Sequence, residues 1–470
     1  MIKQDIKIGL NRLLKFKAYS IINVGGLAVA IASVLVIFSF VFYHLSFDRN
    51  ISDGENSYRI ITRYGDGTYS ANTFSAIGEY LSDCPEVASY SVSFPHLRLD
   101  EVFVNEKKIE ANSAFFVDKS FLDYFSIKTI EGDENSINEP STVLLTPDFA
   151  QKLFANQSPI GKTVFLRSFT ANQDSLIPFT VTGVVEPLPK ASHIQFEMLL
   201  SQKGHFAHQV EMLKTRKVRA GRIYVKLYPS ADVKKLEEKL TLIAAPSLRE
   251  VHGPPLEAFN HKLQNVRDIH FTTGMSNELE TSISRSSVNI LILIGLLIFI
   301  LAAINFVIMN IARQSFYQKT SFVLNLFGGK KINLLNQVIV EILISICFSF
   351  VIAFLLVALS EHYFASFIFL ENNISVQHTS FWLLLLVLFV LTNIVIIVLT
   401  STNIFRYQPR LHQKAPNRKI NTAKILVVFQ FVIVIILIGF AITINRQMNF
   451  ISTKDLGYTS ENAIVIRVPQ

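Results

Sequence analysis

The run IINVGGLAVAIASVLVIFSFVFY, Ile21–Tyr43, sets the architecture of this protein. It carries no charge and is long enough to cross a hydrocarbon layer of ~30 Å as a helix, which takes about 20 residues. Four later runs are also apolar and almost without charge: Val288–Ile311, Leu334–Leu359, Phe381–Thr400 and Ile425–Ile444. The sequence therefore predicts an integral membrane α-helical bundle with about five transmembrane helices.

The overall composition agrees with a membrane protein. Hydrophobic residues make up 50% of the chain and charged residues only 17%, whereas about a quarter of a soluble domain is charged. The two cysteines fall in different regions, Cys84 in a polar stretch and Cys347 inside the third apolar run, so we expect no disulfide and infer no redox compartment. An uncleaved anchor is favoured over a signal peptide, because the first run exceeds the about 7–15 apolar residues of a signal.

The basic residues predict the orientation in the membrane. The net charge is +8, and Lys and Arg gather before the first run, between the second and third, and between the fourth and fifth. The connection 360–380 contains Glu361 and Glu371 but neither Lys nor Arg. Under the positive-inside rule the N-terminus is cytoplasmic and the C-terminal end is outside. The positive charge thus indicates orientation rather than nucleic-acid binding.

The residues before the first run also predict a helix. Ile2, Ile6, Leu10 and Leu13 project within an arc of about 80° when successive residues are placed 100° apart. Lysines lie between them, which suits a helix on the inner leaflet. An ordinary basic flank with only topological meaning remains the alternative.

Roughly 240 residues, 45–287, separate the first two runs, enough for one or two folded domains. Three segments have strand patterns: STVLLT (141–146), FTVTGVV (179–185) and RIYVKLYP (222–229). In TPDFAQKLF (146–154), Thr146 suits an N-cap and Pro147 the first helical position, and Phe149, Leu153 and Phe154 are expected to face a core. The sequence predicts a large mixed α/β (α+β) domain outside the cytoplasm.

The segment NQSPIGKTVF, 156–165, ends like a phosphate-binding loop at Gly161-Lys162-Thr163. A Walker A loop needs glycine five positions before Gly161, where this chain has Asn156. We therefore expect a turn, and no ATPase, catalytic residue or cofactor-binding residue in this chain. His205, His208 and Glu211 share a helical face, but scattered surface histidines are commoner than metal sites, so no metal is expected.

Longer stretches, taken in order, resemble one family. They are KAYSIINVGGLAVAIASVLVI (17–37), LSFDRNISDGENSYRI (45–60), FFVDKSFLDYFSIKTIEGD (115–133), STVLLTPDFAQKLFANQSPIGKTV (141–164), FTVTGVVEPLPKASHIQFEMLLS (179–201) and AINFVIMNIA (303–312). This series is similar to the MacB/FtsX-like ABC transporter permeases, with a MacB-like periplasmic core domain between FtsX-like permease helices. The end of the chain resembles the fifth helix of the duplicated, eight-span members, so we expect a truncated or partial second copy.

The topology and the resemblance together divide the chain into eleven segments. These are a cytoplasmic amphipathic N-terminal helix at 1–19, the first transmembrane helix at 20–44, the extracytoplasmic MacB-like domain at 45–287, the second helix at 288–312, a cytoplasmic coupling loop at 313–333, the third helix at 334–359, a short external loop at 360–380, the fourth helix at 381–402, a basic cytoplasmic loop at 403–424, the fifth helix at 425–445 and the start of a second extracytoplasmic domain at 446–470.

The resemblance implies a permease subunit of the bacterial inner (cytoplasmic) membrane rather than an enzyme. ATP and Mg²⁺ would bind a separate cytoplasmic ABC ATPase, whose motion would reach the periplasmic domain and export or extract an amphipathic lipoprotein, peptide or antibiotic. Its implied partners are that ATPase, a second permease half or a second copy, membrane lipid, and a periplasmic adaptor with an outer-membrane channel, but no nucleic acid. Two alternatives remain: an FtsX-like signalling protein that controls an envelope enzyme without transport, and a degenerate or truncated half-permease.

The resemblance assigns ATPase coupling to the loop after the second helix. The residues implied in that contact are Lys319, Thr320, Leu324, Phe327, Gly328, Gly329, Lys330 and Lys331. Family members have charged or small residues where this chain has Thr320, Phe322, Leu324 and Asn325. Apolar anchors can still dock a helix in a groove. The alternative is a basic loop that only fixes topology.

Two further features concern the helices themselves. Glu341 lies just inside the third run, and we expect it to reach towards the cytoplasmic surface, in the direction of Lys330 or Lys331, rather than to act in transport. Gly26 and Ala30 place small residues four apart in the first run, which predicts close helix packing, either within the chain or between two copies.

Overall fold

The computed structural model describes residues 2–75, 77–95, 102–104, 107–111, 113–170, 173–204, 211, 221–252, 259–312, 331–364, 379–406 and 422–454. The chain divides into two compact units. The first, the membrane unit, combines Met1–Phe40 with Ile290–Gln470, and the second, the domain unit, is Val41–Asn289.

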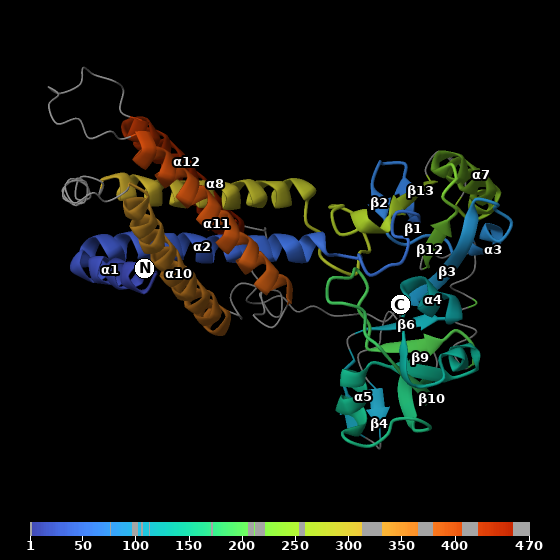
Figure 1. The fold of residues 1–470 in the computed structure, drawn as a ribbon. Helices are drawn as coiled ribbons and strands as arrows, with labels where there is room; N and C mark the ends of the chain where they lie inside the picture. Colours follow the sequence, from blue (N-terminus) through green and yellow to red (C-terminus); the bar gives the residue numbers. More distant parts are fainter. Residues whose placement is uncertain are drawn as a thin grey trace, which may run out of the picture. The chain divides into compact units, whose positions relative to one another are not determined.

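The membrane unit is built from helices (Figure 1). They are α1 (Ile2–Lys15), α2 (Lys17–Leu45), α8 (Arg285–Ala312), α10 (Lys331–Phe364), α11 (Thr379–Arg406) and α12 (Thr422–Thr453). Within the described ranges, five of these, α2, α8, α10, α11 and α12, are long and apolar enough to cross a membrane. The predicted class, a membrane helical bundle with a large mixed α/β domain after its first helix, is confirmed.

Among the described residues, α2, α8, α10 and α11 share an apolar cluster. Ile31 and Leu35 of α2 meet Ile342 and Ile346 of α10 and Ile396 of α11. Outside this seam, large apolar side chains are exposed along α11 and α12. Such a surface is stable against hydrocarbon but not against water. The pattern of burial therefore agrees with helices that face lipid.

Helix α1 lies where the sequence predicted a helix, and one of its sides packs against α10. Leu13 is buried, whereas Ile6 and Leu10 are exposed. A Cβ added at Gly9 would lie 3.1 Å from Cδ1 of Ile344, so the two helices approach closely. One side of α1 is therefore used for packing against protein, and the remaining apolar side chains are left for the membrane surface.

The domain unit contains one long mixed sheet with short helices. Its described strands run in the order β13-β1-β12-β3-β6-β11-β8-β10-β9-β4-β5, with β2 beside β1 and β7 beside β10. The strands are β1 (Ser57–Tyr64), β2 (Tyr69–Ser70), β3 (Val87–Pro95), β4 (Val102–Val104), β5 (Lys107–Ile109), β6 (Ala114–Val117), β7 (Thr129–Gly132), β8 (Thr142–Leu145), β9 (Thr163–Thr170), β10 (Gln173–Val185), β11 (Met198–Ser201), β12 (Arg222–Leu227) and β13 (Phe259–Asn265). The helices are α3 (Ile77–Leu81), α4 (Lys119–Phe125), α5 (Pro147–Phe154) and α7 (Val233–His252).

The pairings are antiparallel except for β10 with β8 and β11 with β6, which are parallel. Each strand expected from the sequence is present, as β8, β10 and β12. Helix α5 begins at Pro147 as expected, with Thr146 extended at the N-cap position, although its side chain makes no capping bond.

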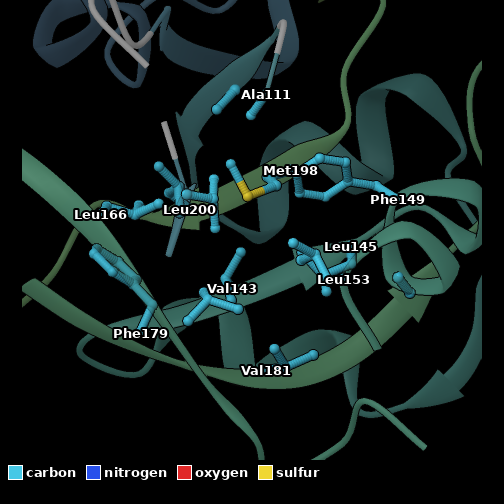
Figure 2. Packing of buried hydrophobic residues seen from close by; sticks show 14 of the residues in the cluster. Ala111, Val143, Leu145, Phe149, Leu153, Leu166, Phe179, Val181, Met198 and Leu200 are labelled. Carbon is cyan, nitrogen blue, oxygen red and sulfur yellow. The ribbon is translucent and has the colours of Figure 1, made fainter. Parts of the chain in front are cut away.

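An apolar core, shown in Figure 2, lies around β8, β10, β11 and α5. Val143 and Leu145 come from β8, Phe179 from β10 and Met198 from β11, and all four are completely buried. Phe149, Leu153 and Phe154 of α5 complete the cluster, which confirms their expected inward direction. Full burial of such a side chain contributes ~1.5–3 kcal/mol. This core accounts for the folding of this half of the sheet.

The segment with Gly161-Lys162-Thr163 is a turn that leads into β9, as the sequence predicted. Gly161 has a φ of 77°, in the left-handed region that glycine tolerates best. Its backbone N–H donates to Val181 O over 2.8 Å. The Lys162 ammonium contacts the Gln157 side chain and lies 4.9 Å from the centre of the Phe154 ring. The lysine is thus bound within its own turn.

Candidate functional site

The residues predicted to contact an ATPase fall almost entirely outside the described ranges. This applies to Lys319, Thr320, Leu324, Phe327, Gly328, Gly329 and Lys330, and the described chain resumes at Lys331, the first residue of α10. Their role stays a prediction. His205 and His208 also lie outside the described ranges, and within those ranges no group of three or more His, Cys, Asp and Glu side chains is placed to hold a metal ion.

The small residues of α2 differ in how far they are buried. Ala28 and Ala32 are buried against the rest of the described bundle, whereas Gly26 is exposed. A Cβ added at Gly26 meets no atom within 4 Å in the described part of the chain. Gly26 therefore does not pack against the described neighbours of α2, whereas Ala30 is half-buried, and packing between two copies stays a prediction.

The described residues instead converge where α2 ends and α8 begins. We call this the domain root: the last turn of α2 and the residues after it (43–48), the loop 190–193, and the segment 266–285 that leads into α8. All of it belongs to the domain unit. Three sets of contacts hold the domain root together.

The first set surrounds Asp48, which follows α2 and is completely buried. Its φ of 56° is unusual for a residue with a Cβ. The Asp48 backbone N–H donates to Ala191 O over 2.9 Å. Its Oδ1 accepts from Ser192 Oγ at 2.9 Å and from the His193 backbone N–H at 3.1 Å, and lies 2.8 Å from His193 Nδ1. These bonds compensate a buried carboxylate and fix the backbone turn.

The same set continues into the sheet. Nε2 of His193 lies 2.9 Å from the Tyr224 hydroxyl on β12. Because a carboxylate only accepts, a proton on His193 Nδ1 can be donated to Asp48, and the Tyr224 hydroxyl can either donate or accept at Nε2. Burial alone would raise the pKa of Asp48, but the interactions with His193 and Ser192 outweigh it and lower the pKa. All three side chains are buried, so they fix geometry and cannot reach a substrate.

The second set joins the last turn of α2 to the segment before α8. Nδ1 of His44 lies 2.7 Å from Nε2 of His270. The Phe47 ring stacks on the His270 ring, with centroids 3.5 Å apart and planes 6° apart. Burial lowers the pKa of His270 to about 4, with a further lowering from the charge of His44. Neutral His270 can therefore take part in this contact at neutral pH.

The third set fixes the segment 275–278 over the sheet. Arg59 of β1 is completely buried and binds both oxygens of Glu278, Nη1 at 2.8 Å from Oε2 and Nη2 at 2.5 Å from Oε1. Arg59 Nη2 also donates to Gln264 Oε1 over 2.7 Å, and Arg222 donates to the backbone oxygen of Asn277. A bidentate pair of this kind fixes direction as well as distance.

The contacts of the domain root were not predicted from the sequence. Asp48 and His193 both lie in stretches that carry the family resemblance, but they are 145 positions apart, and Arg59 and Glu278 are 219 apart. Spacing rules report neighbours on one helix or strand, so they cannot find such pairs. A buried charge in an otherwise apolar strand, as at Arg59, is the one local signal.

Comparison with known proteins gives the affiliation of this fold. Residues 20–243 match the family of the MacB-like periplasmic core domain. This chain carries a MacB-like periplasmic core domain. The resemblance to MacB/FtsX-like permeases is thereby confirmed.

Several known proteins are similar to part of this chain. The macrolide export ATP-binding/permease protein MacB of Neisseria meningitidis is 26% identical over 235 residues, which cover 49% of this chain and 32% of that protein. The chain thus spans about a third of the length of the curated relatives it matches. Among solved structures, a domain described as part of a Porphyromonas gingivalis permease has a TM-score of 0.38 at 19% identity, covering 49% of this chain and 96% of that one. The periplasmic region of MacB from Actinobacillus actinomycetemcomitans has a TM-score of 0.33 at 21% identity, covering 48% and 95%.

Proposed function

We propose that this chain is the permease subunit of a MacB-like ABC transporter of the bacterial inner membrane. In this proposal its large domain lies in the periplasm and its N-terminus in the cytoplasm, as the positive-inside rule predicts. A separate cytoplasmic ATPase binds ATP and Mg²⁺, and its motion moves the domain, which exports or extracts an amphipathic substrate such as a lipoprotein, a peptide or an antibiotic.

The domain root is the observation that carries this proposal. A MacB-like domain is inserted between two apolar helices, and both of its connections to them are held by buried polar contacts. Hydrogen bonds and ion pairs between buried groups are directional and costly to separate. A movement of the helices is therefore passed to the domain rather than absorbed at the connection. A domain that only needed a tether would be served by a flexible linker.

The proposed partners follow from the same reasoning. The ATPase would contact the loop 313–333, which includes Lys319 and Lys331. A second permease half or a second copy would complete the bundle. A periplasmic adaptor and an outer-membrane channel would receive the substrate.

The test uses the full-length chain with its two cysteines replaced by serine and one cysteine introduced at Asn50, which is exposed beside the domain root. The chain is expressed with the ABC ATPases encoded nearby. We expect one ATPase to co-purify, and we expect MgATP to change the labelling rate of Asn50→Cys by a membrane-impermeant maleimide. Lys107→Cys, exposed in β5, is the matched control and should label at a constant rate.

Three outcomes would contradict the proposal. One is purification without any ATPase under all conditions. Another is labelling of Asn50→Cys only after permeabilisation of intact spheroplasts, which would invert the topology. The third is crosslinking of the domain in cells to an envelope hydrolase and to no export partner, which would favour the signalling alternative.

A further inference from the structure

The helices that flank the predicted coupling loop are both bound to one short stretch of the N-terminus. Helix α8 ends at Ala312 and α10 begins at Lys331, so these helices lead into and out of residues 313–330. On one flank, the Tyr19 hydroxyl donates to Oδ1 of Asn310 over 3.2 Å. On the other flank, Arg12 contacts Glu341. All of these residues belong to the membrane unit.

The contact with α10 is an ion pair joined by a hydrogen bond. Arg12 Nη1 lies 3.7 Å from Oε2 of Glu341, and Arg12 Nη2 donates to Oε1 of Gln337 over 3.2 Å. Glu341 is only 4% exposed, although the sequence predicted that it would reach towards the surface. An acidic side chain at this depth is costly unless it has a cationic neighbour, and α1 supplies one.

Close packing reinforces that contact. Besides its approach to Ile344, a Cβ at Gly9 would lie 3.5 Å from the Cα of Glu341, so the two helix backbones nearly touch. Leu13, one residue after Arg12, is buried. Helix α1 therefore cannot follow a path independent of the first turns of α10.

The connection from α1 to α2 is also short and bonded. Only Phe16 separates the two helices, and its backbone N–H donates to Arg12 O over 3.1 Å. The Ser20 hydroxyl donates back to Leu13 O over 2.8 Å. Beyond this joint α2 is continuous from Lys17 to Leu45, whose last turn carries His44 of the domain root.

We propose that Arg12 and Tyr19 are positioning residues that tie both flanks of the coupling loop to the start of α2. Displacement of the loop then moves α2, and α2 moves the domain root. This inference rests on the proposed function, because it names the residues through which ATPase motion would enter the helix. The competing explanation is that Arg12 only neutralises a buried carboxylate, with no part in coupling.

Variants at Arg12 separate these two explanations in the full-length chain with Asn50→Cys. Arg12→Ala removes the contacts of the Arg12 side chain with Glu341 and Gln337. Arg12→Glu combined with Glu341→Arg rebuilds the ion pair with reversed charges. Tyr19→Phe removes the other tie without changing shape. Lys15→Gln is the matched control, because it removes one positive charge from an exposed position of the same helix.

Three quantities are measured: the amount of ATPase that co-purifies, its hydrolysis rate, and the MgATP-dependent change in labelling at Asn50→Cys. We expect Arg12→Ala and Tyr19→Phe to keep the bound ATPase and its hydrolysis, while the change in labelling falls ~5-fold or more. The reversed pair should restore it, and Lys15→Gln should match the parent chain. Hydrogen exchange of residues 17–45, measured without nucleotide, should rise in Arg12→Ala and not in Lys15→Gln.

Two failures are distinguishable. If no ATPase binds the parent chain, the proposed function fails, and hydrogen exchange along α2 still decides whether the tie restrains that helix. In the second failure, MgATP changes the labelling of Asn50→Cys equally in the parent chain and in Arg12→Ala, with equal hydrogen exchange along α2. That result would refute the positioning role of Arg12 and leave the proposed function standing.

Discussion

Two of the buried regions of the domain unit are built from opposite chemistry. Around β8, β10, β11 and α5 the buried side chains are apolar, as at Val143 and Phe179 (Figure 2). At the domain root the buried groups include Asp48, Arg59 and His193. Apolar contacts favour compactness without prescribing direction. Buried ion pairs add little net stability but are costly to break, so the comparison suggests that the root is selected for geometry.

The largest expected effect comes from breaking the Arg59–Glu278 pair. Arg59→Met leaves the Glu278 carboxylate, whose side chain is 13% exposed, without its main partner, and we expect the free energy of unfolding to fall by ~3–5 kcal/mol. Arg59→Met with Glu278→Met should recover most of that loss, because no uncompensated charge remains. Denaturant unfolding in detergent measures both. A double variant as unstable as the single one would show that the pair stabilises the fold.

A comparable loss is expected in the apolar core, for a different reason. Leu145→Ala removes a completely buried side chain and should lower the free energy of unfolding by ~2–5 kcal/mol through a cavity. We expect it to leave the MgATP-dependent labelling of Asn50→Cys unchanged wherever the chain is folded, whereas the Arg59/Glu278 double variant should reduce that change. Equal responses of the two variants would remove the distinction between the regions.

Acidification should weaken the domain at two histidines. Burial lowers the pKa of His261 and of His270 to about 4, below the ~6.5 of an unfolded chain. Between pH 6.5 and 4 the unfolded state therefore binds more protons, so stability is lost as the pH falls, by at most ~1.4 kcal/mol per pH unit for each histidine. Unfolding midpoints measured between these limits test this. His270→Asn should flatten the dependence, and an unchanged slope would contradict the assignment.

The smallest effects concern two glycines in the membrane unit. Gly295→Ala would place a Cβ 2.8 Å from Cε2 of Phe38, between α8 and α2, and should destabilise the chain by ~1–3 kcal/mol. Gly26→Ala meets no described atom within 4 Å and should be neutral, or stabilising by up to ~1 kcal/mol. Thermal unfolding and crosslinking measure both. A Gly26→Ala variant that loses a crosslinked dimer would show that this face packs against a second copy.

The sequence alone predicted the features that depend on a local pattern of apolar residues. Apolar length predicted the five spans, and periodicity predicted β8, β10, β12 and the inward side of α5. It also predicted a helix before the first span, where the structure has α1, but not the close approach of α1 to α10 at Gly9. It also missed the domain root, because contacts such as Asp48 with His193 join residues that only the folded chain brings together.

The number of residues in helix α2 sets the angle, around the helix axis, between a residue at its start and one at its end. At 1.5 Å per residue its 29 residues extend ~44 Å, more than the ~30 Å of hydrocarbon that a spanning helix has to cross. Tyr19 and His44 are 44 − 19 = 25 positions apart, which at 100° per residue puts them within about 20° of the same side. One inserted residue would misalign the two ends by about 100°, even though every other contact in the protein could still form.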